Sequence, residues 1–155
     1  MKRLALFLFG FLLVSSTIFS QHNPFGNHFI SNYSRDVYQA EPQNWSVTQD
    51  HRGVIYIGNQ GYILEYDGES WYKIANANGS YVRSLATDDE GIVYVGNMGD
   101  FGYLRPDASG ELQYVSLARE IDSTFQDIWS VYTHGDTIYF SSYNYIFKYK
   151  RDTLL

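Results

Sequence analysis

The chain has 155 residues, no cysteine and a formal net charge of −6 from 11 basic and 17 acidic side chains. Nucleic-acid binding requires clustered Lys and Arg, so this composition argues against it, and the lack of cysteine excludes disulfides and thiolate metal sites. Aromatic residues make up 18% of the chain, which is typical of a packed β protein and not of a disordered one.

The first 21 residues have the order of a secretory signal peptide. Lys2 and Arg3 precede an apolar run from Leu4 to Val14, and small polar residues follow it. The run is too short for a membrane-spanning helix, which needs about 20 residues. We therefore expect residues 1–21 to be a signal peptide and the mature protein to be exported, to the periplasm or the outer side of the inner membrane.

Residues 22–43 form a lead-in whose composition differs from that of the rest of the chain, with two prolines and isolated aromatic residues. Phe29–Tyr33 is predicted to be a lone strand. In a closed ring of sheets, a strand from one terminus often completes the sheet made by the other and so removes an open edge. We assign that ring-closing role to Phe29–Tyr33 in the full-length protein.

A repeat then begins. Residues 49–67 read QDHRGVIYIGNQGYILEYD and residues 87–104 read TDDEGIVYVGNMGDFGYL, with six identical positions 38 residues apart. A looser third copy, THGDTIYFSSYNYIFKYK, starts at Thr133. Self-similarity at about 40 residues with short strands indicates propeller blades or another stacked array.

Each copy divides into short β-strands, and the second strand of each is almost continuously β-branched or aromatic, as in a strand covered on both faces. Helix is nearly absent; the best candidate, Leu117–Ile121, is too short to count. The predicted strands are Trp45–Thr48, Val54–Ile57, Tyr62–Tyr66 and Tyr72–Ile74; Val82–Ala86, Ile92–Val95, Phe101–Leu104 and Gln113–Leu117; and Ile128–Tyr132, Thr137–Phe140 and Tyr145–Tyr149.

The predicted fold is therefore all-β, with about three blades of four antiparallel strands in an incomplete propeller. The blades are expected at about residues 44–80, 81–124 and 125–155, the last of them without its fourth strand. Closed propellers usually need four to eight blades. We interpret the chain as the N-terminal part of a truncated ring, and expect its exposed blade edges and apolar end face to favour association or partial unfolding.

The turn between the first two strands is marked by the same residues in both clear copies. Asp50 stands three residues before Gly53, and Asp88 three before Gly91. An Asp side chain accepts hydrogen bonds from turn amides, and Gly takes the left-handed conformation. These four residues are predicted to be structural, and the further glycines in each copy to mark bulges or close backbone approach.

Ligands usually enter a propeller on the face formed by the connections from second to third strand and from fourth to next first strand. A polar rim around aromatic faces on that side could hold a sugar or a peptide. For each residue alone, packing or turn formation is the more ordinary explanation. The predicted ligand-binding residues are Trp45, Asn59, Gln60, Arg83, Asn97, Asp100, Trp129 and Asn144.

Catalytic and metal-binding patterns are missing from the sequence. The four histidines are scattered, so neither a metal pair nor a catalytic triad emerges. Asp88 and Asp89 share one turn, whereas glycoside-cleaving carboxylates must flank a bound substrate. No catalysis by this segment, no metal and no cofactor are expected.

The repeat QDHRGVIYIGNQGYILEYDG and its echo resemble the two-component regulator propeller repeat, and the segment around Asn32–Ser46 resembles the start of periplasmic sensor regions in that family. The resemblance runs from about Phe29 to the end of the chain. Where the family often has Trp in the second strand, this chain has Tyr56, Tyr94 and Tyr139. The aromatic character is kept.

The resemblance implies an extracytoplasmic ligand-sensing module of a transmembrane regulator. Its parent would add the remaining blades, an immunoglobulin-like domain, a membrane helix and an output domain such as a kinase, cyclase or phosphatase. The implied partners are an unidentified small molecule, with an oligosaccharide among the candidates, the rest of the propeller, and a second copy in a full-length homodimer. Two alternatives stay open: a secreted propeller enzyme acting on glycans as a hydrolase or lyase, and a structural or interaction propeller.

Overall fold

The computed structural model describes residues 29–121, 125–150 and 153–154. The predicted signal peptide, residues 1–21, lies outside these ranges. The chain divides into two units, residues 1–32 and 33–155, and each is treated by itself. In the first unit the described residues, 29–32, have no regular secondary structure.

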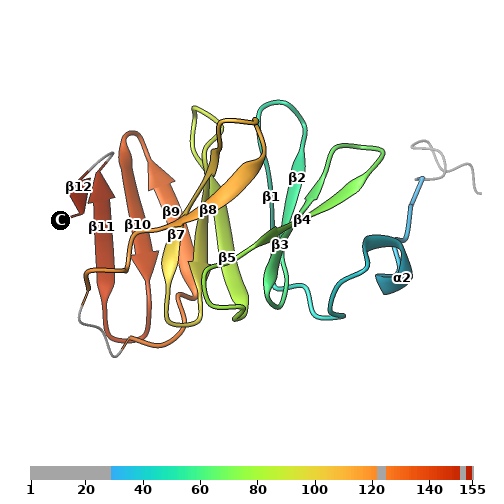
Figure 1. The fold of residues 1–155 in the computed structure, drawn as a ribbon. Helices are drawn as coiled ribbons and strands as arrows, with labels where there is room; N and C mark the ends of the chain where they lie inside the picture. The colour runs from blue at the N-terminus through green and yellow to red at the C-terminus, as the bar shows by residue number, and fades with distance from the viewer. Residues whose placement is uncertain (1–28, 122–124, 151–152, 155) are drawn as a thin grey trace, which may run out of the picture. The chain divides into compact units, whose positions relative to one another are not determined.

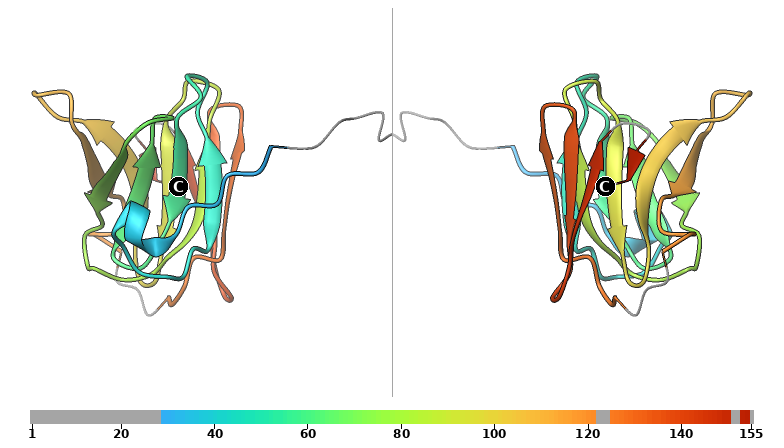
Figure 2. Two further views of the ribbon diagram at one scale, coloured as in Figure 1. Left: turned by 90° about the vertical axis from the view of Figure 1, so that its right-hand side faces the viewer. Right: turned by 90° about the vertical axis from the view of Figure 1, so that its left-hand side faces the viewer.

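The second unit is built from three four-stranded sheets, each antiparallel throughout, which follow one another along the chain (Figure 1; two further views in Figure 2). The first sheet has the order β1-β2-β3-β4, the second β5-β6-β7-β8 and the third β9-β10-β11-β12. The all-β prediction of successive four-stranded blades is confirmed. The strands are β1 (Ser46–Gln49), β2 (Ile55–Gly58), β3 (Tyr62–Tyr66), β4 (Trp71–Ala75), β5 (Val82–Thr87), β6 (Val93–Asn97), β7 (Phe101–Pro106), β8 (Leu112–Ser116), β9 (Ser130–His134), β10 (Thr137–Ser141), β11 (Ile146–Lys150) and β12 (Thr153–Leu154).

Two local expectations were wrong; a third segment, Leu117–Ile121, was not predicted to be a helix and is not one. Phe29–Tyr33 contains no strand, so its ring-closing role remains a prediction about the whole protein. The third sheet does have a fourth strand, because β12 pairs with β11 through Tyr149 and Leu154 and through Lys150 and Thr153. Leu117–Ile121 forms a turn, closed by a 3.0 Å bond from the Ile121 amide to the Ala118 carbonyl, and no helix.

The one helix among the described residues is α2 (Arg35–Tyr38), in the lead-in. It ends at Gln39, which takes the left-handed conformation with φ 53°. Tyr38 and Ala40 are buried with Leu64 of β3, and Trp71 packs against them. The lead-in therefore covers one face of the first sheet, which is the apolar stabilisation that so short a helix needs.

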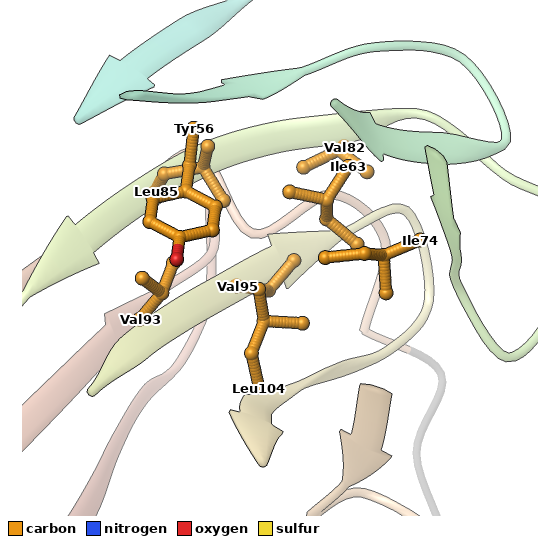
Figure 3. Close-up of a cluster of buried hydrophobic side chains, with 8 residues drawn as sticks. All are labelled: Tyr56, Ile63, Ile74, Val82, Leu85, Val93, Val95 and Leu104. Atoms are coloured by element: carbon orange, nitrogen blue, oxygen red, sulfur yellow. The ribbon is translucent and has the colours of Figure 1, made fainter. Parts of the chain in front are cut away.

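Two hydrophobic clusters join the sheets face to face. Tyr56, Ile63 and Ile74 of the first sheet meet aliphatic side chains of the second (Figure 3). A second cluster, which includes Tyr94 and Phe101, joins the middle sheet to the third. Because the middle sheet is covered on both sides, every residue of β6 is buried, as its continuous apolar sequence predicted.

Gly58 and Gly96 occupy the same place in successive sheets, where the next sheet passes close by. A Cβ on Gly58 would lie 2.8 Å from the Val82 carbonyl oxygen, and one on Gly96 would lie 2.9 Å from the Ile128 Cβ. Neither distance leaves room for a methyl group. The repeated glycine is thus a requirement of sheet-to-sheet approach, and Ser141 takes its place in the third sheet.

The two repeated turns have the same hydrogen bonds. Oδ1 of Asp50 accepts from the amides of Arg52 and Val54 at 2.9 and 3.1 Å, and Asp88 accepts from the two equivalent amides at 3.0 and 2.9 Å. Gly53 and Gly91 have φ of 87° and 84°, a range that favours glycine.

Asp50 is also the most constrained carboxylate of the first sheet. Its Oδ2 lies 2.7 Å from the Arg52 guanidinium, and its side chain is fully buried. Burial by itself would raise the pKa of Asp50, but the hydrogen bonds from the Arg52 side chain and from the Val54 and Arg52 amides outweigh burial and lower the pKa below its ordinary value of 3.8.

We predict that Asp50→Asn lowers the free energy of unfolding at pH 7 by about 1–2 kcal/mol, because an amide cannot replace the charged acceptor. A depressed pKa means that the charged form stabilises the fold above about pH 4, and that this contribution is lost as the pH falls through the folded pKa. The difference between the two proteins, measured by urea unfolding at pH 7 and pH 3, should therefore shrink at pH 3. Asp89→Asn, on an exposed side chain, is the control, and an Asp50 effect independent of pH would contradict the prediction.

Candidate functional site

The predicted ligand face has the expected connections in the structure. The turn after β2 bridges to the segment before β5 through Gln60 and Tyr81, and the turn after β6 bridges to the segment before β9 through Met98 and Asp127. Each blade therefore holds the start of the next blade's first strand. The starts of β5 and β9 and the turns that support them lie at one end of the sheets.

Three of the predicted residues stand at equivalent positions at this end. Trp45, Arg83 and Trp129 each directly precede a serine at or near the start of the first strand of a sheet. Two of those serines tie neighbouring first strands together: Ser46 Oγ accepts from the Leu85 amide at 3.1 Å, and Ser84 Oγ donates to the Ile128 carbonyl at 2.8 Å. These bonds set the three preceding side chains beside one another.

The Arg83 guanidinium lies between the two tryptophans. Its central carbon is 4.0 Å from the centroid of a Trp45 ring and 5.0 Å from that of Trp129, with Tyr81 at 4.7 Å. Arg83 Nε also donates to Asp127 Oδ1 at 2.8 Å, and the two side chains are only 12% and 15% exposed. We call Trp45, Tyr81, Arg83, Asp127 and Trp129 the Arg83 cluster.

The cluster presents aromatic surface to solvent. Trp45 is 43% exposed and Trp129 is 41% exposed. The Trp129 ring also meets the exposed Tyr143 edge-on at 5.9 Å. Asn144 follows Tyr143 in the chain and is exposed. The site can therefore offer stacking faces at its rim and one arginine between them.

A β-bulge positions Arg83. Val82 pairs with Asn97 and Ser84 pairs with Gly96, which leaves Arg83 as the extra residue of β5. Bulges re-aim side chains and are common beside functional sites. The sequence signal for this arrangement is the recurring pair Trp-Ser, Arg-Ser and Trp-Ser at residues 45–46, 83–84 and 129–130.

Asn59 belongs to the scaffold. Its side chain is completely buried, and its Nδ2 donates to the carbonyls of Glu41 and Gln43 at 2.6 and 3.1 Å and to Asn44 Oδ1 at 2.7 Å. Its Oδ1 accepts from the Glu41 amide at 3.1 Å. The side-chain amide of Asn59 therefore forms its hydrogen bonds with the lead-in and holds it against the first sheet.

Asn97 and Asp100 are buried inside the middle sheet and do not join the Arg83 cluster. Asp100 Oδ1 accepts from the Phe101 amide at 2.8 Å and from Ser116 Oγ at 2.7 Å. Both polar atoms of the Asn97 side chain are buried. Burial, and then the charge of Asp100, raise the pKa of Tyr114 far above its usual range, so its hydroxyl stays neutral.

A groove that the sequence did not predict lies between the first and second sheets, beside the Asp50 and Asp88 turns. Its volume is about 750 Å³, and its charged and polar lining includes Arg52, Glu65, Tyr72 and Glu111 over an apolar floor. Burial raises the pKa of Glu65. Two blades contribute to the groove, so no single stretch of sequence could have marked it.

Among the described residues, no group of three or more His, Asp or Glu side chains is placed to hold a metal ion. No helix in the described part of the chain is long and apolar enough to cross a membrane.

The chain is similar to several solved structures, one of which is described here, and no protein-family model and no curated protein matches it. The structure is described as the extracellular domain of BT4673, a candidate one-component system from B. thetaiotaomicron; the TM-score is 0.54 and the sequence identity 20%. The match covers 82% of this chain and 18% of that chain. At this identity the likeness shows the shared β fold, and the present chain spans about a fifth of the larger protein's length.

Proposed function

We propose that this chain is an extracytoplasmic ligand-sensing propeller module, a part of a larger transmembrane regulator of the two-component regulator propeller family. The fold it shares with the extracellular domain of a regulator supports this proposal, as does the internal repeat at residues 49–67 and 87–104. The remaining blades, the output domain and the export to the periplasm belong to the same proposal.

The observation that carries the proposal is the Arg83 cluster. Trp45 and Trp129 keep two fifths of their surface exposed, and the Arg83 guanidinium lies 4.0 Å from the Trp45 ring centroid. Exposed aromatic faces beside a fixed polar group are the usual elements of small-molecule recognition. Ligand binding would act on signalling only through a difference in affinity between two arrangements of the ring or its dimer.

The experiment uses the indole N–H signals of the three tryptophans. A panel of oligosaccharides and peptides is titrated into the ¹⁵N-labelled chain. A ligand of the proposed face should shift the Trp45 and Trp129 signals while Trp71, which packs against the lead-in helix, stays in place. We expect Trp45→Ala or Trp129→Ala to weaken binding about tenfold or more, because a stacking contact contributes about 1–3 kcal/mol.

Tyr132→Ala is the matched control, because Tyr132 is an exposed aromatic residue on the third sheet outside the cluster. Its affinity should equal that of the unmodified chain. Ligands that shift only other signals, or that bind both tryptophan variants normally, would place recognition elsewhere and reject the Arg83 cluster as the site. Cleavage of an oligosaccharide during the titration would instead favour the glycan-processing alternative.

A further inference from the structure

We infer that the Arg83 cluster selects a ligand carrying an anionic oxygen group, a carboxylate or a sulfate, on or next to a ring that can stack on tryptophan. This inference rests on the proposed ligand-binding role of the cluster and specifies the chemistry that it recognises. It follows from the directions in which the Arg83 guanidinium can still make contacts.

Three aromatic rings crowd the guanidinium. Trp45 covers it at 4.0 Å, and Trp129 and Tyr81 contact it at 5.0 and 4.7 Å. A guanidinium is planar and its five N–H bonds point outward within that plane. An acceptor atom of a ligand therefore binds Arg83 best edge-on, in the guanidinium plane.

Not all N–H donors of the Arg83 guanidinium have a hydrogen-bond acceptor. Asp127 accepts from Nε through one carboxylate oxygen, an arrangement that leaves the Nη edge outside the ion pair. Nη1 is buried and has no hydrogen-bond partner. A buried donor without an acceptor is costly, and an anionic oxygen supplies the strongest hydrogen bond to it, often two bonds at once.

The ligand's ring fits the rest of the cluster. An anion held in the guanidinium plane projects the attached ring toward the exposed parts of Trp45 and Trp129, which remain 43% and 41% open. Because Nη1 is buried, the inference requires these partly exposed rings to shift when the anion enters. Arg83 then binds the anionic group, and the tryptophans stack on the attached ring.

Asp127 limits the affinity. Its carboxylate shares the guanidinium with any incoming anion, and two negative groups around one cation repel each other. Asp127→Asn keeps an oxygen acceptor for Nε and removes this repulsion. The inference therefore predicts that Asp127→Asn binds the anionic ligand more tightly, which a role for Asp127 as a direct ligand contact would not.

The test compares matched pairs of probes on the whole chain by the indole N–H titration: glucuronate against glucose, and benzoate against benzyl alcohol, with glucosamine as the cationic counterpart. We expect each acid to bind at least tenfold more tightly than its neutral partner, and glucosamine to bind most weakly. Arg83→Gln should lower affinity for the acids about 10- to 100-fold, the value of a charged hydrogen bond, with little effect on the neutral probes. Arg105→Gln, at an exposed arginine on β7, is the control and should bind as the unmodified chain does.

The outcomes separate the two proposals. If neutral and acidic probes bind equally and binding needs the tryptophans, the ligand site stands and anion selection is wrong. If no probe or panel ligand shifts Trp45 or Trp129, both proposals fail. Should Arg83→Gln not fold, as its amide signals would show, Asp127→Asn decides: unchanged or weaker acid binding overturns the inference, and tighter binding supports it.

Discussion

Phe101→Ala is expected to lower the free energy of unfolding by about 3–5 kcal/mol, because it opens a cavity between the second and third sheets. Phe101 is completely buried, and its ring centroid lies 4.5, 4.8 and 5.6 Å from those of Phe140, Phe147 and Phe125. Through Phe140 and Phe147 it joins the middle sheet to the aromatic core of the third sheet. Urea unfolding would measure the loss.

The same variant should uncouple the third sheet selectively. Hydrogen exchange of β9 and β10 is expected to rise more than that of β2 and β3, which pack in the other cluster. Phe101→Leu, which keeps much of the volume, should cost about 1.5 kcal/mol or less, and Tyr132→Ala, at a side chain 62% exposed, should cost little. A uniform rise in exchange across all three sheets would show that they unfold as one unit.

Gly102→Ala is expected to be nearly as damaging for the opposite reason, with a loss of about 3 kcal/mol. A Cβ at Gly102 would overlap the Val115 carbonyl oxygen and lie 2.9 Å from its carbonyl carbon and 3.1 Å from the Ser116 Cα. Both are backbone atoms of β8, the strand paired with β7. A flexible side chain could move aside, but the backbone can yield only if the two strands part.

The control for Gly102 is Gly135→Asn. Gly135 lies in the turn between β9 and β10 with φ 57°, and a Cβ there would meet no atom within 4 Å. Asn tolerates this left-handed conformation, so a cost below about 1 kcal/mol is expected. Equal losses for the two variants in urea unfolding would mean that the Gly102 effect is not steric.

The order of the blades was predictable because each blade is formed by residues that are close in the sequence. Its strands are joined by short turns, and the turn residues, such as Asp50 and Gly53, act on amides two to four positions away. Strand positions were predicted to within one or two residues for the same reason: the alternation of buried and exposed side chains is a property of one strand and its neighbours.

The lead-in could not be predicted in this way. A strand needs the free edge of a sheet as its partner. Tyr33 instead packs through its side chain: its ring centroid lies 5.2 Å from that of Tyr66 and 5.5 Å from that of Trp71. Asn59 looked like a rim residue because an asparagine before a turn is ordinarily exposed. The folded lead-in buries it, and no local pattern encodes a contact between residues 41–44 and 59.

By itself the sequence determined the all-β class, the number and order of the blades, and the chemistry of their turns, because all of these depend on contacts within about 40 residues. Only the tertiary structure decided which of the eight predicted ligand residues meet. It joins Trp45, Arg83 and Trp129 through the approach of three first strands, and it buries Asn59, Asn97 and Asp100. The reason is that a side chain's neighbours across a sheet-to-sheet interface come from other blades, and the glycines at 58 and 96 fix how closely those blades can come.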